Sequence, residues 1–96
     1  MNNIRSKADV AKVVDRLIET QKWLTLRDEF YGIGDRRNSC VAITRITKDD
    51  LDMYHTTYHD DISGDDWTEV TYPCEVESII WFYRKSINHS GQLADL

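Results

Sequence analysis

The sequence predicts an α+β protein in which a three-stranded antiparallel sheet is covered on one face by an N-terminal and a C-terminal helix. Apolar residues at helical spacing occur near both ends of the chain, and three stretches rich in β-branched and aromatic residues lie between them. The predicted order is therefore α-β-β-β-α. The chain has 96 residues, of which 41% are hydrophobic and 30% charged. These values are typical of one folded domain with one core, which we expect to span residues 1–96.

The first helix is predicted from its start signal and its apolar stripe. Ser6 and Asp9 are spaced as a capping box. In this motif the serine side chain accepts a hydrogen bond from a free backbone N–H, and the acid is stabilised by the positive end of the helix dipole. The stripe that follows has helical spacing and consists of Val10, Val13, Val14, Leu17 and Ile18.

The segment after this helix is ambiguous. Residues 23–31 follow neither the helical nor the strand period, so a short second helix and an edge strand are both compatible with them. The two glycines in residues 32–35 predict a turn. This turn is not a dinucleotide-binding loop, because Arg37 stands where the third glycine would be required.

Three strands are predicted over residues 39–47, 52–59 and 67–72. In the second, Tyr54, Thr56 and Tyr58 share one face. We expect that face to be open to solvent, although a shift of one residue would exchange the two faces of the sheet. A short helix competes with this strand, because Thr47 and Asp50 have capping-box spacing. The connection to the third strand is predicted to turn at Gly64.

The last helix is predicted to begin at Pro73, which fixes a helical φ angle at its first position. Its apolar residues repeat at helical spacing and are Val76, Ile79, Ile80, Tyr83 and Ile87. Gly91 is a typical stop signal. We expect residues 91–96 to form a frayed tail.

Charge is distributed unevenly along the chain. The first 48 residues carry a balance of +4 and the remaining 48 a balance of −9, which gives the net charge of −5. From residue 49 to residue 77 there are ten carboxylates and no lysine or arginine. Tyrosines and a tryptophan alternate with these acids. An acidic surface of this kind steers toward a basic partner and then anchors it through aromatic contacts.

These observations predict a small protein-binding inhibitor that masks a basic surface of a partner protein. Inhibitors that neutralise toxins, and phage proteins that imitate DNA to block host defence, work through such surfaces. The surface would repel phosphate, so no direct nucleic-acid binding is expected. We expect no enzymatic activity and no cofactor. The residues predicted to bind the partner are Tyr54, Tyr58, Asp60, Asp61, Asp65, Asp66, Trp67 and Glu69.

Two other functions compete with this prediction. A metal-dependent hydrolase would use His55 and His59 with a nearby aspartate, but on a strand the two histidines are about 13 Å apart, too far for one metal ion. In either case the neighbouring carboxylates should favour the protonated imidazoles. A regulatory homodimer would use Trp81 and Phe82, which cannot both face the core that Tyr83 faces.

The location of the protein is predicted from what its sequence lacks. It has no apolar run of membrane-spanning length, and its first ten residues do not resemble a secretory signal. We therefore expect a cytoplasmic protein that does not associate with membranes. Cys40 and Cys74 fit this compartment as buried, free thiols.

Overall fold

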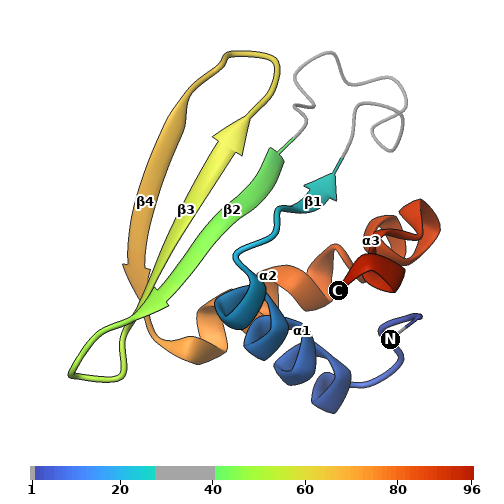
Figure 1. The fold of residues 1–96 in the computed structure, drawn as a ribbon, viewed down its shortest axis with the longest axis horizontal. Coiled ribbons are helices and arrows are strands. Elements are labelled where there is room, and N and C mark those ends of the chain that lie inside the picture. The colour runs from blue at the N-terminus through green and yellow to red at the C-terminus, as the bar shows by residue number, and fades with distance from the viewer. Residues whose placement is uncertain (1, 28–40) are drawn as a thin grey trace.

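The computed structural model describes residues 2–27 and 41–96, and these form a four-stranded antiparallel sheet with three α-helices. The elements follow the order α1 (Lys7–Thr20), β1 (Leu24–Arg27), β2 (Val41–Lys48), β3 (Tyr54–Asp60), β4 (Asp66–Thr71), α2 (Pro73–Phe82), α3 (Arg84–Ser90) and the 3₁₀ helix η2 (Gln92–Asp95). The strands lie side by side in chain order (Figure 1). The predicted α+β class is confirmed, and the predicted strand number is corrected from three to four.

The additional strand is β1, which the sequence left undecided between a helix and an edge strand. Leu24 and Leu26 are buried in the core, and Thr25 pairs with Ala42 of β2. Four residues are too few for a strand period to be recognised in the sequence. The predictions for residues 28–40, including the turn at residues 32–35 and Cys40, lie outside the described residues.

Helix α1 begins with the predicted capping box. The Asp9 N–H donates to Ser6 Oγ at 3.3 Å, and the Ser6 N–H donates to Asp9 Oδ2 at 3.1 Å. These hydrogen bonds lower the pKa of Asp9. The largest single cause of this lowering is a further hydrogen bond, which the Arg5 N–H donates to the Asp9 carboxylate. Four residues of the predicted stripe are buried, which are Val10, Val13, Val14 and Leu17.

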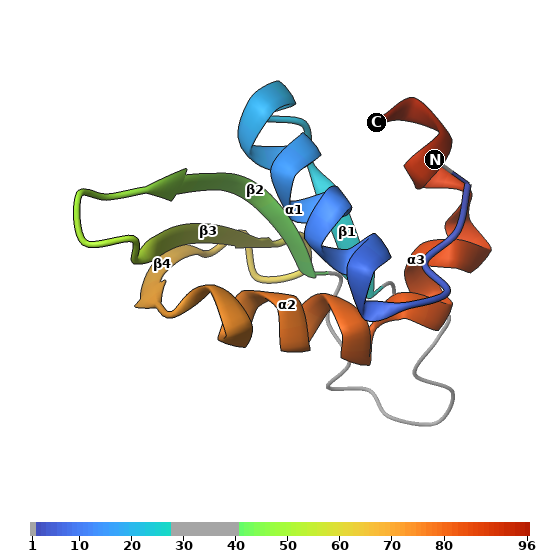
Figure 2. The ribbon, with the colours of Figure 1, turned by 90° about the horizontal axis from the view of Figure 1, so that it is seen from below.

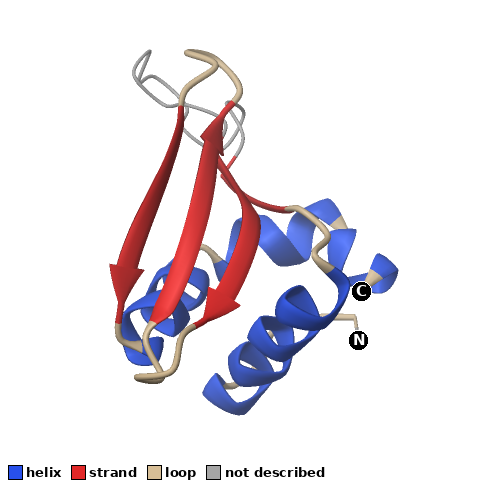
Figure 3. Ribbon diagram, turned by 60° about the vertical axis from the view of Figure 1, so that its left-hand side comes forward, coloured by secondary structure: helices blue, strands red, loops and turns tan. Residues whose placement is uncertain are grey.

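One hydrophobic core lies between the helices and one face of the sheet. It joins residues of α1, Ile43 and Ile46 of β2, Ile80 of α2 and Ile87 of α3. Figure 3 shows α1 and α2 beside and beyond the strands, so that no helix of the described residues lies on the opposite sheet face. We call the first face the inner face and the second the outer face. Among the described helices, none is long and apolar enough to cross a membrane.

The predicted final helix is two helices in the structure. Helix α2 ends at Phe82, and α3 begins at Arg84. Pro73 opens α2, and the Glu75 carboxylate accepts the Tyr72 N–H at 2.8 Å. Gly91 ends α3 in the left-handed conformation, with φ +72°, as predicted. The equivalent conformation at Gly64, with φ +76°, confirms the predicted turn between β3 and β4.

The predicted frayed tail is wrong. Residues 92–95 form η2, and Leu93 is fully buried in the core. The Gln92 side chain bonds both backbone groups of Thr25, and the Arg16 guanidinium donates to the Leu96 carbonyl at 2.7 Å. At the other end of the chain, the segment before α1 lies along α3 (Figure 2), where Ile4 exchanges two hydrogen bonds with the Asn88 amide.

Candidate protein-binding surface

The acidic residues of the middle of the chain do not form one surface. Asp49, Asp50 and Asp52 belong to the turn between β2 and β3, whereas the carboxylates of residues 60–66 surround the turn between β3 and β4. The two turns lie at opposite ends of the sheet (Figure 1). Seven residues of β3 separate them, a distance of roughly 20 Å. The predicted single acidic face is therefore replaced by two separate clusters.

The first turn uses its carboxylates within the fold. Asp49 Oδ1 accepts the N–H groups of Leu51 and Met53, and Asp49 Oδ2 lies 2.8 Å from Nε2 of His55. The His55 bond, followed by the Met53 N–H, lowers the pKa of Asp49. Asp52 pairs with Lys48 at 3.3 Å. With two of its three acids engaged and a lysine beside them, this turn offers little unbalanced negative charge.

The second turn has four carboxylates, which we call the acidic tip: Asp60, Asp61, Asp65 and Asp66. Asp60 Oδ1 accepts the N–H groups of Ile62 and Ser63, so this side chain shapes the turn. The Asp65 side chain is exposed, and so is Ile62 at the centre of the turn. The acidic tip therefore presents an aliphatic side chain surrounded by negative charge.

His59 connects the acidic tip to the outer face of the sheet. Its Nδ1 lies 2.6 Å from Asp66 Oδ1, and its Nε2 lies 3.1 Å from Asp61 Oδ1. The Asp66 hydrogen bond is the main cause that raises the pKa of His59, because a protonated imidazole donates from both nitrogens. This confirms the predicted effect of neighbouring acids for His59. The exposed Trp23 ring lies 5.5 Å from the His59 ring, centroid to centroid.

The register of β3 is opposite to the one expected for partner binding. Tyr54 and Tyr58 retain only 8% and 4% of their surface, because they lie on the inner face with Ile43. The pKa of Tyr58 is raised to about 12, mainly by burial and secondly by the negative charge of the Glu69 carboxylate. Neither tyrosine can anchor a partner from this position, so that part of the predicted site is corrected.

Trp67 keeps part of its predicted exposure. It stands opposite Tyr58, and the two rings stack with a centroid distance of 5.4 Å and an interplanar angle of 19°. Because β4 lies at the margin of the sheet, 39% of the Trp67 surface remains accessible. Glu69 follows on the same inner side of β4 and is exposed. Of the predicted aromatic anchors, only Trp67 is thus available to a partner.

Sequence reasoning missed three exposed apolar side chains close to these acids. Ile62 lies in the acidic tip, Val70 on the outer face of β4, and Trp23 beside His59. The signal for Ile62 was available, because an isoleucine inside a run of aspartates has no strand in which to be buried. Trp23 could not be placed, because the strand that follows it was not recognised.

The histidine arrangement does not assemble a metal site in the described part of the chain. His55 bonds Asp49 at one end of β3, and His59 bonds Asp61 and Asp66 at the other. Within residues 2–27 and 41–96, no group of three or more histidine, cysteine or acidic side chains is arranged to hold a metal ion. The hydrolase alternative therefore finds no ligand set there.

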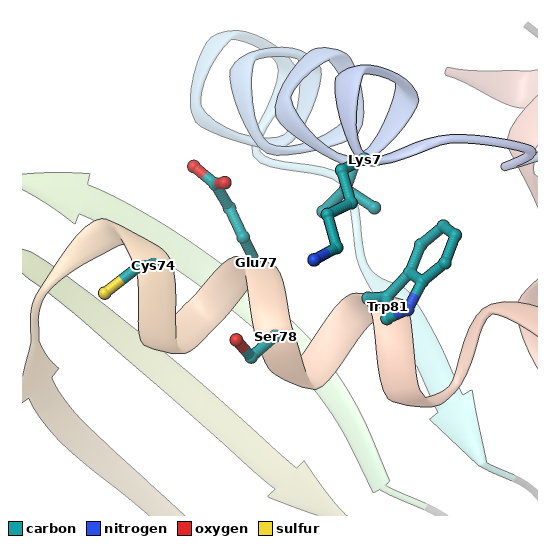
Figure 4. A pocket seen from close by; sticks show the side chains of 6 residues that line it. Lys7, Cys74, Glu77, Ser78 and Trp81 are labelled. Carbon is teal, nitrogen blue, oxygen red and sulfur yellow. The ribbon is translucent and has the colours of Figure 1, made fainter.

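A shallow pocket of about 240 Å³ lies between α1 and α2. Its lining residues are Lys7, Val10, Cys74, Glu77, Ser78 and Trp81. Figure 4 shows Cys74 at one end and Trp81 at the other, so their polar groups do not converge on one point. The volume is below the roughly 300 Å³ at which small-molecule pockets begin. Cys74 was predicted to be buried, but it is exposed.

The aromatic pair at the end of α2 is split between the core and the solvent. Trp81 packs against the core and lies 4.0 Å below the Arg84 guanidinium. Phe82 is exposed and meets the Tyr83 ring edge-on. Of the two residues predicted for a homodimer, only Phe82 is thus exposed.

Comparison of the chain with models of protein families, with curated proteins and with solved structures finds no match. The function is therefore inferred from the charge, exposure and geometry of the surface around the acidic tip.

Proposed function

We propose that this protein is a small acidic inhibitor that binds and masks a basic surface on another protein, of the kind that neutralises a toxin or blocks a host defence. The observation that carries this proposal is the acidic tip. Its four carboxylates lie at the end of a hairpin that extends away from the helices (Figure 1). The stretch from residue 49 to residue 77, which includes this hairpin, contains ten carboxylates and no lysine or arginine.

The tip combines the two features that a steering surface requires. Asp61 and Asp66 share the single imidazole of His59, and Asp65 is exposed, so negative charge remains to attract a basic partner over about one Debye length, roughly 10 Å at moderate salt. Exposed Ile62 and half-exposed Trp67 then provide apolar area at the point of contact. A nucleic acid would meet the same charges with its phosphates, which supports a protein as the partner. Many such basic protein surfaces are themselves nucleic-acid-binding surfaces.

Charge reversal tests this function with a control that the chain itself supplies. Asp65 in the acidic tip and Asp50 in the first turn are both exposed, and the bonds that shape the two turns come from Asp60 and Asp49 instead. Asp65→Lys and Asp50→Lys therefore change the net charge equally at sites roughly 20 Å apart. In this test, wild-type protein is first used at low salt to capture a basic partner from the native host. The association rate of each variant with the captured protein is then measured.

We expect Asp65→Lys to slow association about 3-fold to 10-fold and to flatten its salt dependence, whereas Asp50→Lys leaves the rate near wild type. Equal slowing by both variants would show that only the net charge matters and would remove the acidic tip from the mechanism. Capture of acidic proteins alone would contradict the function itself.

A further inference from the structure

Strand β4 forms a free edge of the sheet among the described elements. It is the last strand in the order β1-β2-β3-β4, and it lies at the outer margin of the sheet in Figure 1. The first five of its six residues are exposed. Its pairing with β3 runs without a bulge from Tyr54–Thr71 to His59–Asp66. Proteins usually protect an edge with charged side chains, proline or a bulge. Strand β4 has no lysine, proline or bulge, and its charged residues are two acids, Asp66 and Glu69, which repel an acidic strand but attract a basic one.

The hydrogen-bonding pattern shows which backbone groups of β4 point away from the sheet. The Asp60 N–H donates to the Asp65 carbonyl at 2.9 Å, so residues 60 and 65 form a hydrogen-bonded pair. In an antiparallel ladder such pairs alternate with non-hydrogen-bonded pairs, whose side chains approach more closely. The 3.0 Å contact between the Thr57 and Thr68 hydroxyls agrees with this alternation. The N–H and C=O groups of Asp66, Thr68 and Val70 therefore face the free edge.

The opposite edge of the same sheet is closed. Strand β1 has only four residues and a bulge between Thr25 and Arg27. The Gln92 side chain acts there as a neighbouring peptide group would. Its Oε1 accepts the Thr25 N–H at 2.8 Å, and its Nε2 donates to the Thr25 carbonyl at 2.7 Å. In the described residues no side chain plays this part for β4.

The charges beside β4 favour a basic strand over a second copy of this chain. Two copies of β4 in antiparallel pairing, with matching faces, can be centred on Trp67, Thr68 or Glu69. The first places Asp65 opposite Glu69 and the last places Glu69 opposite Glu69, whereas the arrangement centred on Thr68 leaves Asp66 and Glu69 opposite residues without positive charge. Each copy also carries a net charge of −5. A partner strand with lysine or arginine meets Asp66 on the outer side and Glu69 on the inner side.

We propose that an extended basic segment of the partner pairs with β4 as a fifth strand, aligned by the outward backbone groups of Asp66, Thr68 and Val70. This inference rests on the proposed function and specifies how the partner is held. The acidic tip attracts the partner, and main-chain hydrogen bonds along β4 then hold one segment of it in an extended conformation. Strand addition to an exposed sheet edge is an established mode of peptide recognition.

The test separates backbone pairing from charge attraction. Thr68→Pro removes the outward N–H and no bond to β3, whereas Thr68→Ala keeps that N–H and equally loses the hydroxyl contact with Thr57. The probe is a capped eight-residue peptide of alternating lysine and threonine. A second probe carries N-methyl groups on every peptide nitrogen, which removes the donors on both edges of the peptide without changing the charge. Peptide affinity is measured by calorimetry, and the amide shifts of residues 66–71 locate the bound peptide.

We expect wild type and Thr68→Ala to bind the unmodified peptide with the same affinity. Thr68→Pro should bind it at least about tenfold more weakly. N-methylation should cause a similar loss with the wild-type protein, a comparison that holds whether or not the proline variant folds. Strand addition is overturned if N-methylation has no effect, or if the unmodified peptide does not bind. In either case the Asp65→Lys comparison with the captured partner still decides the proposed function separately.

A second copy of the chain as the occupant is a distinct outcome. Sedimentation of wild type, Thr68→Ala and Thr68→Pro without peptide detects it. We expect all three to be monomers. A dimer that forms in wild type and Thr68→Ala, but not in Thr68→Pro, would overturn the basic partner strand as the occupant of β4.

Discussion

The two edge strands of the sheet, β1 and β4, differ in how far their outer backbone groups are covered. At β1 the edge is short, bulged and covered by the Gln92 amide, and Leu93 is buried next to it. At β4 the edge is longer, regular and exposed along most of its length. The comparison teaches that contacts far apart in the sequence close the β1 side, while the outward backbone groups of β4 have no such cover among the described residues. Substitutions on the two sides should therefore differ in kind.

The largest difference is expected between two apolar truncations. Leu93→Ala removes a fully buried side chain beside β1 and should lower the free energy of unfolding by about 2–5 kcal/mol. Val70→Ala removes a side chain of β4 that is 54% exposed and should change it by less than about 0.5 kcal/mol. Urea denaturation of both variants measures the difference. Similar losses would mean that β4 is covered in solution.

A smaller effect is expected from the side chain that closes the β1 edge. Gln92→Ala leaves both backbone groups of Thr25 without their partner, which should cost about 1–3 kcal/mol. Glu69→Ala on β4 serves as the control and should change stability by less than about 0.5 kcal/mol. Hydrogen exchange of the Thr25 amide provides a local measurement, because exchange should accelerate in the Gln92 variant. Unchanged exchange would contradict the capping role.

The smallest effect is a pH dependence on the β4 side. The pKa of His59 is raised in the folded state by its bond to Asp66, so protonation of His59 stabilises the fold. This contribution is fully present below the unfolded pKa, about 6.5, and is lost as the pH rises through the higher folded pKa. We expect the stability advantage of wild type over His59→Gln to shrink across that range in urea denaturation. In an Asp66→Asn background the shrinkage should be reduced, and an unchanged slope would remove Asp66 as its cause.

The sequence predicted the elements better than it predicted which face of the sheet is buried. The capping box at Ser6, the strands around Tyr58 and Val70, and the stop at Gly91 follow from local patterns, and the structure has them. The burial of Tyr54 and Tyr58 does not follow from alternation alone, because alternation defines two faces without saying which faces the helices. The composition of the faces was a usable signal, since the alternative face of β3 contains two histidines, which pair with acids at the surface.

The candidate site was predicted only in part, for a geometric reason. Asp60, Asp61, Asp65 and Asp66 are close in sequence, so a single turn brings them together. Asp49, Asp50 and Asp52 are also close to one another, but a whole strand carries them to the far end of the sheet. The free edge at β4 could not be foreseen at all. It depends on the order of the strands, whereas the closed edge at β1 depends on a glutamine 67 residues from the backbone that it caps.

The capping of Thr25 by Gln92 has a consequence for how the protein is made. A ribosome that adds roughly 5 to 20 residues per second produces Gln92 about 3 to 13 s after Thr25. During that interval the Thr25 backbone lacks the side chain that caps it. A chain stalled before Gln92 would thus expose two unprotected sheet edges to neighbouring chains. It should therefore depend on chaperones more than the finished protein does.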